Sequence, residues 1–431
     1  MFPKDLNLER ASLGFAVLIF IGAQIQVLLG QGADYMGLRI TLSDLFLPLA
    51  GLFVLYTLIK KQSVFPKWHA PYFTLALILA SASIILGLLT VYLNYGEISN
   101  WALLNRGLGW FILVSYCYLG GWFAQNISSE GRDRAIKIFA LFFLLSVIFF
   151  LGKYFLFELN KSFIDVGKED YDALSGFMGN RNAYAFLFVS MLALCTVFKS
   201  YKSAFLSDGV FAFFWLCIPF IAIFNGSRAG WILLILTILV GVFYLKGKSL
   251  KLIILPLMLS AILLTGFYQT NKNIVLRENQ IRRTQHVFEG AGSDQLRLRV
   301  VDDALALWRE NKIAGTGLGG FLIEQEEKYS GKPQRYGKAF DQIDNSALWI
   351  LTEMGALGAL AFGGLFISIA VGLRRYRSAL TDSLLIVLVF FALYSQVHHI
   401  LYARYLWLLL GLALGGAAQL KKGSNLPRAS A

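Results

Sequence analysis

Residues 71–93 read PYFTLALILASASIILGLLTVYL, a stretch that contains no charged side chain. About 20 consecutive apolar residues are enough for a helix to cross the hydrocarbon core of a bilayer. Comparable apolar runs recur along the whole chain, which is 57% hydrophobic and 15% charged, whereas roughly a quarter of the residues in a soluble domain are charged. The sequence therefore predicts an all-α, polytopic membrane protein.

About twelve transmembrane helices are expected from runs of this length. They span residues 11–30, 43–59, 71–93, 103–124, 136–157, 182–198, 209–225, 229–245, 250–270, 345–373, 380–398 and 403–420. Lys and Arg recur in the loops on one side, whereas the short loop 94–102 on the other side has neither. By the positive-inside rule, the basic loops and both termini are cytoplasmic. The net charge of +13 thus largely reflects topology and gives no support for nucleic-acid binding.

This topology places the longest polar segment, residues 271–344, in a large helical loop on the periplasmic side. The chain is then expected to have about nine transmembrane helices in residues 1–270 and about three in residues 345–431, which end in a cytoplasmic tail. Together these parts are expected to form one membrane domain. The three cysteines lie inside expected helices and have no spacing typical of a disulfide framework or a metal site.

Residues 295–311 of the loop are predicted to form an amphipathic helix. Arg297 shares its apolar stripe and is expected to point inward, where a guanidinium needs an anion. The stripe contains Val301, Ala304, Leu305 and Trp308, and the opposite, solvated face contains Arg299, Asp302, Asp303 and Arg309. The following GTGLGGF, residues 315–321, has the spacing G-x-G-x-x-G. No strand precedes it, so a tight turn is expected in place of a dinucleotide site.

Three arginines are predicted at the same outer level of the membrane. They are Arg181 in GNRNAYAF, Arg228 in NGSRAGW, and Arg297. Arginines at this depth are rare and usually paired or functional, and a guanidinium binds phosphate through two parallel hydrogen bonds. With Arg282 and Arg283 nearby, they predict a site for a polyanion such as a pyrophosphate. The alternative is that these side chains extend toward lipid phosphates.

Asp344 and Asn345 lie at the start of the tenth expected helix. The Asp344 carboxylate either accepts a proton as a general base or caps the helix, a role that Asn345 can equally fill. His398 and His399, followed by Arg404, either contact the substrate or simply lie at the membrane interface. No pattern predicts a metal site or a bound cofactor.

Four segments in this order resemble the superfamily of O-antigen ligases and O-antigen polymerases, which are bacterial inner-membrane glycosyltransferases. They are GNRNAYAF, NGSRAGW, the Arg297 helix ending in AGTGLGGF, and DNSALWILTEMGALG, whereas residues 1–170 agree only in hydropathy. The resemblance implies transfer of a glycan from undecaprenyl pyrophosphate to an acceptor sugar on the periplasmic side, without a metal or other cofactor. It also implies that Arg228 and Arg297 contact the pyrophosphate.

The family's ligases use lipid A–core as the acceptor and carry a histidine before the asparagine, where this chain has Asp344. This departure favours a polymerase of O-antigen, capsule or exopolysaccharide units, which uses a second lipid-linked glycan as the acceptor; a ligase is the alternative. Attack opposite the leaving group would invert the anomeric carbon. The expected catalytic residues are Asp344, Arg228 and Arg297, and the expected substrate contacts are Arg181, Arg282, Arg283, Asn345, His398, His399 and Arg404.

A third hypothesis, from another class, is a flippase or other transporter of lipid-linked glycans. Transport calls for polar residues through the membrane midplane, whereas this chain concentrates them on one side, which argues against it. Membrane lipids and, for a polymerase, a chain-length regulator are the other expected partners.

Overall fold

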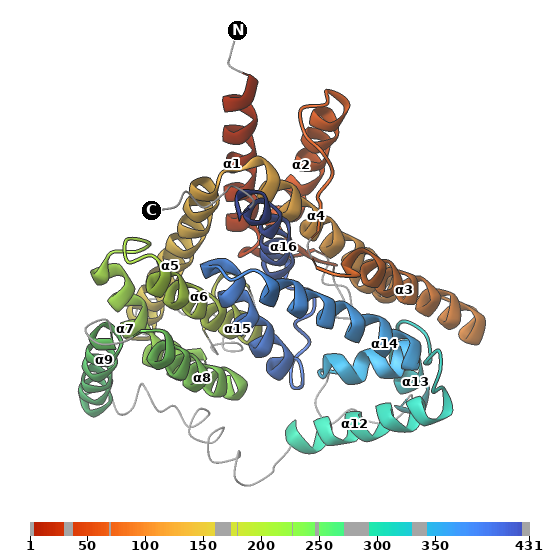
Figure 1. Ribbon diagram of the computed structural model, residues 1–431. Coiled ribbons are helices and arrows are strands. Elements are labelled where there is room, and N and C mark those ends of the chain that lie inside the picture. Colours follow the sequence, from red (N-terminus) through yellow and green to blue (C-terminus); the bar gives the residue numbers. More distant parts are fainter. Residues whose placement is uncertain are drawn as a thin grey trace. The chain divides into compact units, whose positions relative to one another are not determined.

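A computed structural model describes residues 4–29, 38–68, 70–159, 174–178, 180–225, 227–245, 250–270, 293–329 and 343–424. Over these residues the chain is predominantly helical, and the predicted all-α membrane class is confirmed (Figure 1). Within the described ranges, 6 helices are long and apolar enough to cross a membrane, and further apolar helices are shorter. The protein is therefore a multi-pass membrane protein, and the expected number of spans stays a prediction.

The chain forms two compact units. The first contains α1 (Lys4–Gly22), β1 (Gln26–Leu29), β2 (Leu38–Thr41), α2 (Leu42–Ile59), α3 (Phe73–Tyr95), the π-helix η1 (Trp101–Leu108), α4 (Gly109–Asn126), α12 (Ser293–Glu310), α13 (Gly320–Tyr329), α14 (Ser346–Arg375) and α16 (Arg404–Ser424). The second contains most of α5 (Ser129–Leu159), η2 (Gly176–Met178), α6 (Arg181–Tyr201), α7 (Asp208–Asn225), α8 (Arg228–Tyr244), α9 (Lys251–Thr270) and α15 (Ala379–Tyr394).

The tightest packing in the first unit joins α4 to α16. A side chain at Gly120 would lie 2.2 Å from the Leu408 carbonyl oxygen, and one at Gly411 would lie 2.0 Å from the Cys117 carbonyl oxygen. Glycine at these positions therefore lets the two backbones touch, as is common between membrane helices. The α4–α16 seam also buries large rings, because Trp110 and Trp407 meet edge to face with centroids 5.2 Å apart.

The N-terminal helix ends earlier than expected. The predicted span over residues 11–30 is wrong at its end, because α1 stops at Gly22 and β1 pairs antiparallel with β2, with Gln26 opposite Thr41. A short apolar run such as residues 25–29 does not distinguish strand from helix by its pattern. Gly22 permits the return of the chain, since a side chain there would lie 2.6 Å from the Ser43 backbone nitrogen.

The second unit is built around α6, whose side chains from Tyr184 to Lys199 are buried. Helices α8 and α15 pack against it, and α7 packs against α9. Glycine again allows close approach, because a side chain at Gly230 on α8 would lie 3.1 Å from Cβ of Ala185 on α6. The starts of α6 and α8, where Arg181 and Arg228 lie, thus belong to one packed body.

Candidate functional site

The mouth of α14, residues 343–346, brings two predicted site residues together. Asn345 is the N-cap, since its side-chain oxygen accepts from the Leu348 backbone N–H at 2.9 Å. Asp344 is therefore not needed as a cap, and its carboxylate is 47% exposed. Arg297 Nε lies 3.5 Å from Asp344 Oδ2. Of the two roles open to Asp344, the cap belongs to Asn345, and an accessible carboxylate remains beside a guanidinium.

Arg297 does not point inward, as its place on the apolar stripe predicted. Its side chain is 43% exposed. Among the described side chains of α12, from residue 297 on, Val300 and Ala304 are buried, so the inward face is centred nearer Val300 than the sequence pattern indicated. The expected anion for the guanidinium is nevertheless present, because Asp344 fills that place. Helix α12 itself, Ser293–Glu310, confirms the helix predicted over 295–311.

The outward face of α12 is also less solvated than predicted. The Asp303 side chain is 13% exposed and accepts from Lys328 Nζ at 2.6 Å and from Gln325 Nε2 at 3.1 Å, both on α13. Asp303 thus ties α12 to α13. The prediction that it lies on a solvated face is wrong, because α13 covers that part of the helix.

The glycine turn between α12 and α13 packs against α3 and α14. The backbone N–H of Leu318 donates to the Gly87 carbonyl at 2.8 Å, and that of Gly319 donates to Glu353 Oε2 at 2.9 Å. Gly315, Gly317 and Gly319 all have positive φ, which favours glycine. The first two glycines of the G-x-G-x-x-G spacing, together with Gly319, therefore serve a turn inserted between helices, as expected, and the Glu353 carboxylate accepts a hydrogen bond from this turn.

A buried arginine that the sequence interpretation overlooked lies close to the mouth of α14. Arg106, on η1, is 4% exposed, and it hydrogen-bonds to His399 Nε2. His399 Nδ1 lies 3.3 Å from Ser346 Oγ. Tyr402 donates its hydroxyl to the Arg106 carbonyl at 3.0 Å, and burial raises the pKa of Tyr402 to about 12, so the phenol stays protonated as a donor at neutral pH. A charged residue inside a predicted span was the signal that could have revealed Arg106.

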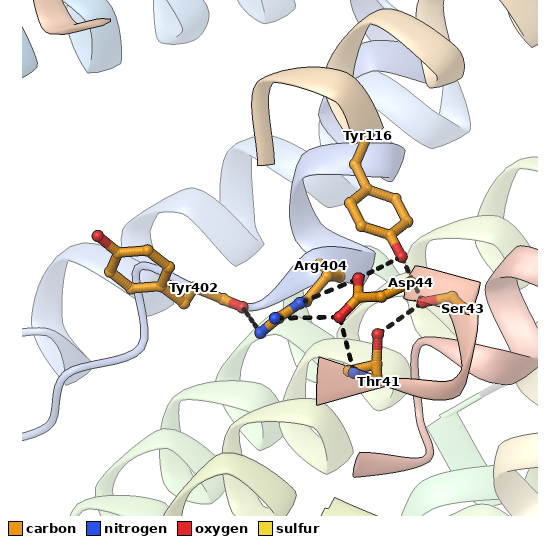
Figure 2. A network of polar contacts seen from close by, with 6 residues as sticks. All are labelled: Thr41, Ser43, Asp44, Tyr116, Tyr402 and Arg404. Atoms are coloured by element: carbon orange, nitrogen blue, oxygen red, sulfur yellow. Dashed lines mark hydrogen bonds and ion pairs between the residues drawn. The ribbon is translucent and has the colours of Figure 1, made fainter. Parts of the chain in front are cut away.

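Arg404, an expected substrate contact, is already paired within the protein (Figure 2). Its Nη2 lies 3.1 Å from Asp44 Oδ2, and both side chains are nearly buried. Figure 2 shows the guanidinium between the Tyr402 carbonyl and Asp44, which also accepts from the Tyr116 hydroxyl at 2.8 Å. Substrate binding by Arg404 stays a prediction, while the structure gives it a clear role in packing.

The second unit contains Arg181 and Arg228, each the first residue of a helix. Asn225 links the two helix starts, because its amide donates to the Arg181 carbonyl at 2.8 Å and its oxygen accepts from the Ser227 N–H at 3.2 Å. Ser227 caps α8 and lies 3.0 Å from the Tyr394 hydroxyl. Helix starts carry partial positive charge and attract anions, so this corner combines two guanidinium groups with two such ends.

The predicted site residues thus form one group in each unit, and two of them, Arg282 and Arg283, belong to neither group. In the first unit, Arg297 meets Asp344 and Asn345 stands beside them, and His399 reaches Ser346. His398 is buried in the same connection before α16. Arg282 and Arg283 lie outside the described residues. The two groups belong to different units, and their convergence on one ligand stays a prediction.

The fold and the site are those of a multi-pass, all-α membrane protein with an exposed arginine–carboxylate pair at the start of a helix. These features alone do not identify a family. Residues 211–363 match the family model described as O-antigen ligase. This match supports membership of the chain in the superfamily of O-antigen ligases and polymerases, as the motifs predicted. No curated protein matches the chain. The matched segment includes Arg228, Arg297 and Asp344, whereas Arg106 and His399 lie outside it.

Proposed function

We propose that this protein is a periplasm-facing polysaccharide polymerase of the bacterial inner membrane, which transfers a glycan from undecaprenyl pyrophosphate to the sugar of a second lipid-linked glycan. The family match supports glycosyltransferase activity of the O-antigen ligase and polymerase type in general. The observation that carries the finer proposal is the Arg297–Asp344 pair, which joins a phosphate-binding group and a proton acceptor at an accessible helix mouth.

The arginines are assigned to the leaving group. The resemblance implies a contact with the pyrophosphate for Arg228 and for Arg297, and a guanidinium would stabilise the charge that develops on the leaving group. Fixed guanidinium groups supply this stabilisation, so the mechanism calls for no metal ion.

Asp344 is assigned to the acceptor. The acceptor hydroxyl oxygen attacks the anomeric carbon, its proton passes to the Asp344 carboxylate, and the bond from carbon to the pyrophosphate oxygen breaks with its electron pair going to the phosphate. Attack from the side opposite the leaving group inverts the anomeric carbon. Binding of the pyrophosphate to Arg297 would draw the guanidinium away from Asp344 and leave the carboxylate free for the acceptor.

An O-antigen ligase that transfers to lipid A–core is the second candidate, and the description of the matching family favours it. The difference lies in the acceptor alone, since donor and leaving group are the same in both. Asp344 supports the polymerase, because the resemblance implies a histidine at this position in ligases.

The test uses the purified full chain in lipid nanodiscs with a lipid-linked repeat unit, with and without lipid A–core. A ladder of products from the donor alone is expected, whereas product only in the presence of lipid A–core would identify a ligase. Arg228→Ala, Arg297→Ala and Asp344→Asn should each lower product formation by at least about 100-fold. Lys60→Ala, an exposed residue at the end of α2, is the control and should keep wild-type activity. Undiminished product from the three variants would refute the proposal.

A further inference from the structure

Arg106 is a buried cation in the first turns of a helix long enough to span the membrane, Trp101–Asn126. Its guanidinium carbon lies 4.1 Å from the ring centroid of Trp101, 4.6 Å from that of Trp349 and 5.3 Å from that of Tyr402. Such contacts stabilise a desolvated cation. The three rings come from η1, from α14 and from the connection before α16, so Arg106 is held from three sides.

The contact from Arg106 to His399 determines where the imidazole carries its proton. A guanidinium has only donors, so His399 Nε2 accepts, and the proton of the neutral ring is on Nδ1. Nδ1 lies 3.3 Å from Ser346 Oγ and donates to it. The His399 ring also meets Trp349 edge to face, with centroids 4.8 Å apart. Both ring nitrogens of His399 are thus used inside the protein, which makes it a supporting group and not the proton acceptor.

Ser346 is the first residue of α14 and follows Asp344 and Asn345 directly. Its backbone N–H donates to the Ser395 carbonyl at 2.7 Å, so Ser346 is held through both its backbone and its side chain. Asp344 lies two residues before Ser346 in the same short segment, and its carboxylate contacts Arg297. The backbone from which the Asp344 carboxylate projects is thus held in place through Ser346.

We propose that Arg106 is a positioning residue for glycan transfer, which holds His399 as the neutral Nδ1–H tautomer so that His399 fixes Ser346 and, through it, the mouth of α14 where Asp344 acts. This role rests on the proposed function. It assigns a task to residues outside the family match, in η1 and in the connection before α16. A misplacement of about 1 Å at a reacting group can lower the rate about 100-fold, and kcat is the quantity that should change.

The tautomer gives the proposal a signature in the pH profile. Among the described residues, Arg106 on η1 bonds to His399, and the Tyr402 ring lies 5.5 Å from the His399 ring. Glu353 on α14 and Arg404 on α16 act electrostatically on the neighbouring Tyr402. Arg106 occupies Nε2, so His399 cannot take a second proton while the contact lasts. In Arg106→Gln the neutral ring is free to carry its proton on Nε2, which removes the donor to Ser346. Below about pH 6.5 an ordinary imidazole takes a second proton, and Nδ1 again donates.

The experiment measures kcat and KM for the lipid-linked donor between about pH 5.5 and 8 in nanodiscs. The wild-type protein is measured first, to establish that it forms product. Arg106→Gln should lower kcat about 100-fold at pH 8 with little change in KM, and activity should rise as the pH falls through about 6.5, because the protonated ring again carries a proton on Nδ1. The double variant Arg106→Gln/His399→Gln should lose that rise. A pH profile of Arg106→Gln parallel to that of wild type would overturn the proposal.

A second pair of variants decides the matter if Arg106→Gln does not fold. In His399→Gln the side-chain oxygen can accept from Arg106 and the amide can donate to Ser346, so activity should stay within about tenfold of wild type, whereas His399→Ala should lose about 100-fold. Equal activity of the two would overturn the proposal while the proposed function stands. Failure of wild type to form product would overturn the proposed function and this role with it.

Discussion

Asp44→Asn is expected to destabilise the first unit strongly. The Asp44 carboxylate accepts four contacts: from Arg404 Nη2 at 3.1 Å and Nε at 3.5 Å, from the Tyr116 hydroxyl at 2.8 Å and from the Thr41 backbone N–H at 2.7 Å (Figure 2). The Asp44 and Arg404 side chains are only 8% and 11% exposed, so water screens the pair little. The contacts join α2, α4 and α16.

The magnitude follows from burial. Removal of one partner of a buried ion pair costs about 3–5 kcal/mol, since the other charge is left without compensation. Asparagine also turns an N–H donor toward groups that are themselves donors. At about 2 °C for each kcal/mol in a unit of this size, the midpoint of thermal unfolding should fall by about 6–10 °C.

Thermal unfolding in detergent micelles, followed by tryptophan fluorescence, measures the effect. Arg404→Gln should lower the free energy of unfolding by a similar amount. The double variant Asp44→Asn/Arg404→Gln should lose at least about 2 kcal/mol less than the two single losses added together, because it leaves no unpaired charge. Asp133→Asn is the matched control, since the Asp133 and Lys202 side chains are 27% and 53% exposed and their pair should contribute at most about 1 kcal/mol. Additive losses, or a change below about 1 °C for Asp44→Asn, would refute the reasoning.

Three further predictions concern the glycine turn, the second unit and the ligand-facing arginine. Gly317→Ala should cost about 3 kcal/mol in thermal unfolding, because φ is +93° and the new methyl group would lie 2.2 Å from a backbone nitrogen of α3, whereas Gly363→Ala, in open space on α14, should be neutral or slightly stabilising. Asn225→Ala should lower the free energy of unfolding by about 1–3 kcal/mol, and with it the unfolding midpoint and the transfer activity, since it leaves the Arg181 carbonyl without this donor; an unchanged midpoint would count against it. Arg297→Lys should raise KM for the donor about tenfold with a smaller effect on kcat, because an ammonium lacks the paired donors of a guanidinium; equal donor KM would contradict the assignment.

The sequence predicted the features that depend on composition and periodicity. Apolar runs gave the membrane helices, and the 3.6-residue pattern gave α12, because both are local properties of the chain. The face that α12 buries was not predicted correctly. Arg297 shares a stripe with apolar residues, but the inward face is chosen by the neighbour against which a helix packs, and the structure centres it nearer Val300.

The contact between Arg106 and His399 could not be predicted from spacing. Arg106 and His399 are far apart in the chain and meet only because η1, α14 and the connection before α16 pack together. Arg404 illustrates the converse, since its place beside two histidines indicated a ligand contact, while its distant partner Asp44 gives it a packing role. Long-range pairing therefore decided the cases in which a charged side chain had more than one plausible role.

The difference in burial between Arg297 and Arg106 indicates which of their contacts a ligand could replace. The Arg297–Asp344 pair is 43% and 47% exposed, and an exposed ion pair contributes about 0–1 kcal/mol, so a pyrophosphate can replace the carboxylate at little cost. Arg106 is 4% exposed, and loss of its contacts would leave a desolvated cation, which costs several kcal/mol. In the proposed cycle, the arginine that exchanges its partner, Arg297, lies exposed at the start of α14, and the arginine that keeps its contacts, Arg106, is buried among aromatic rings.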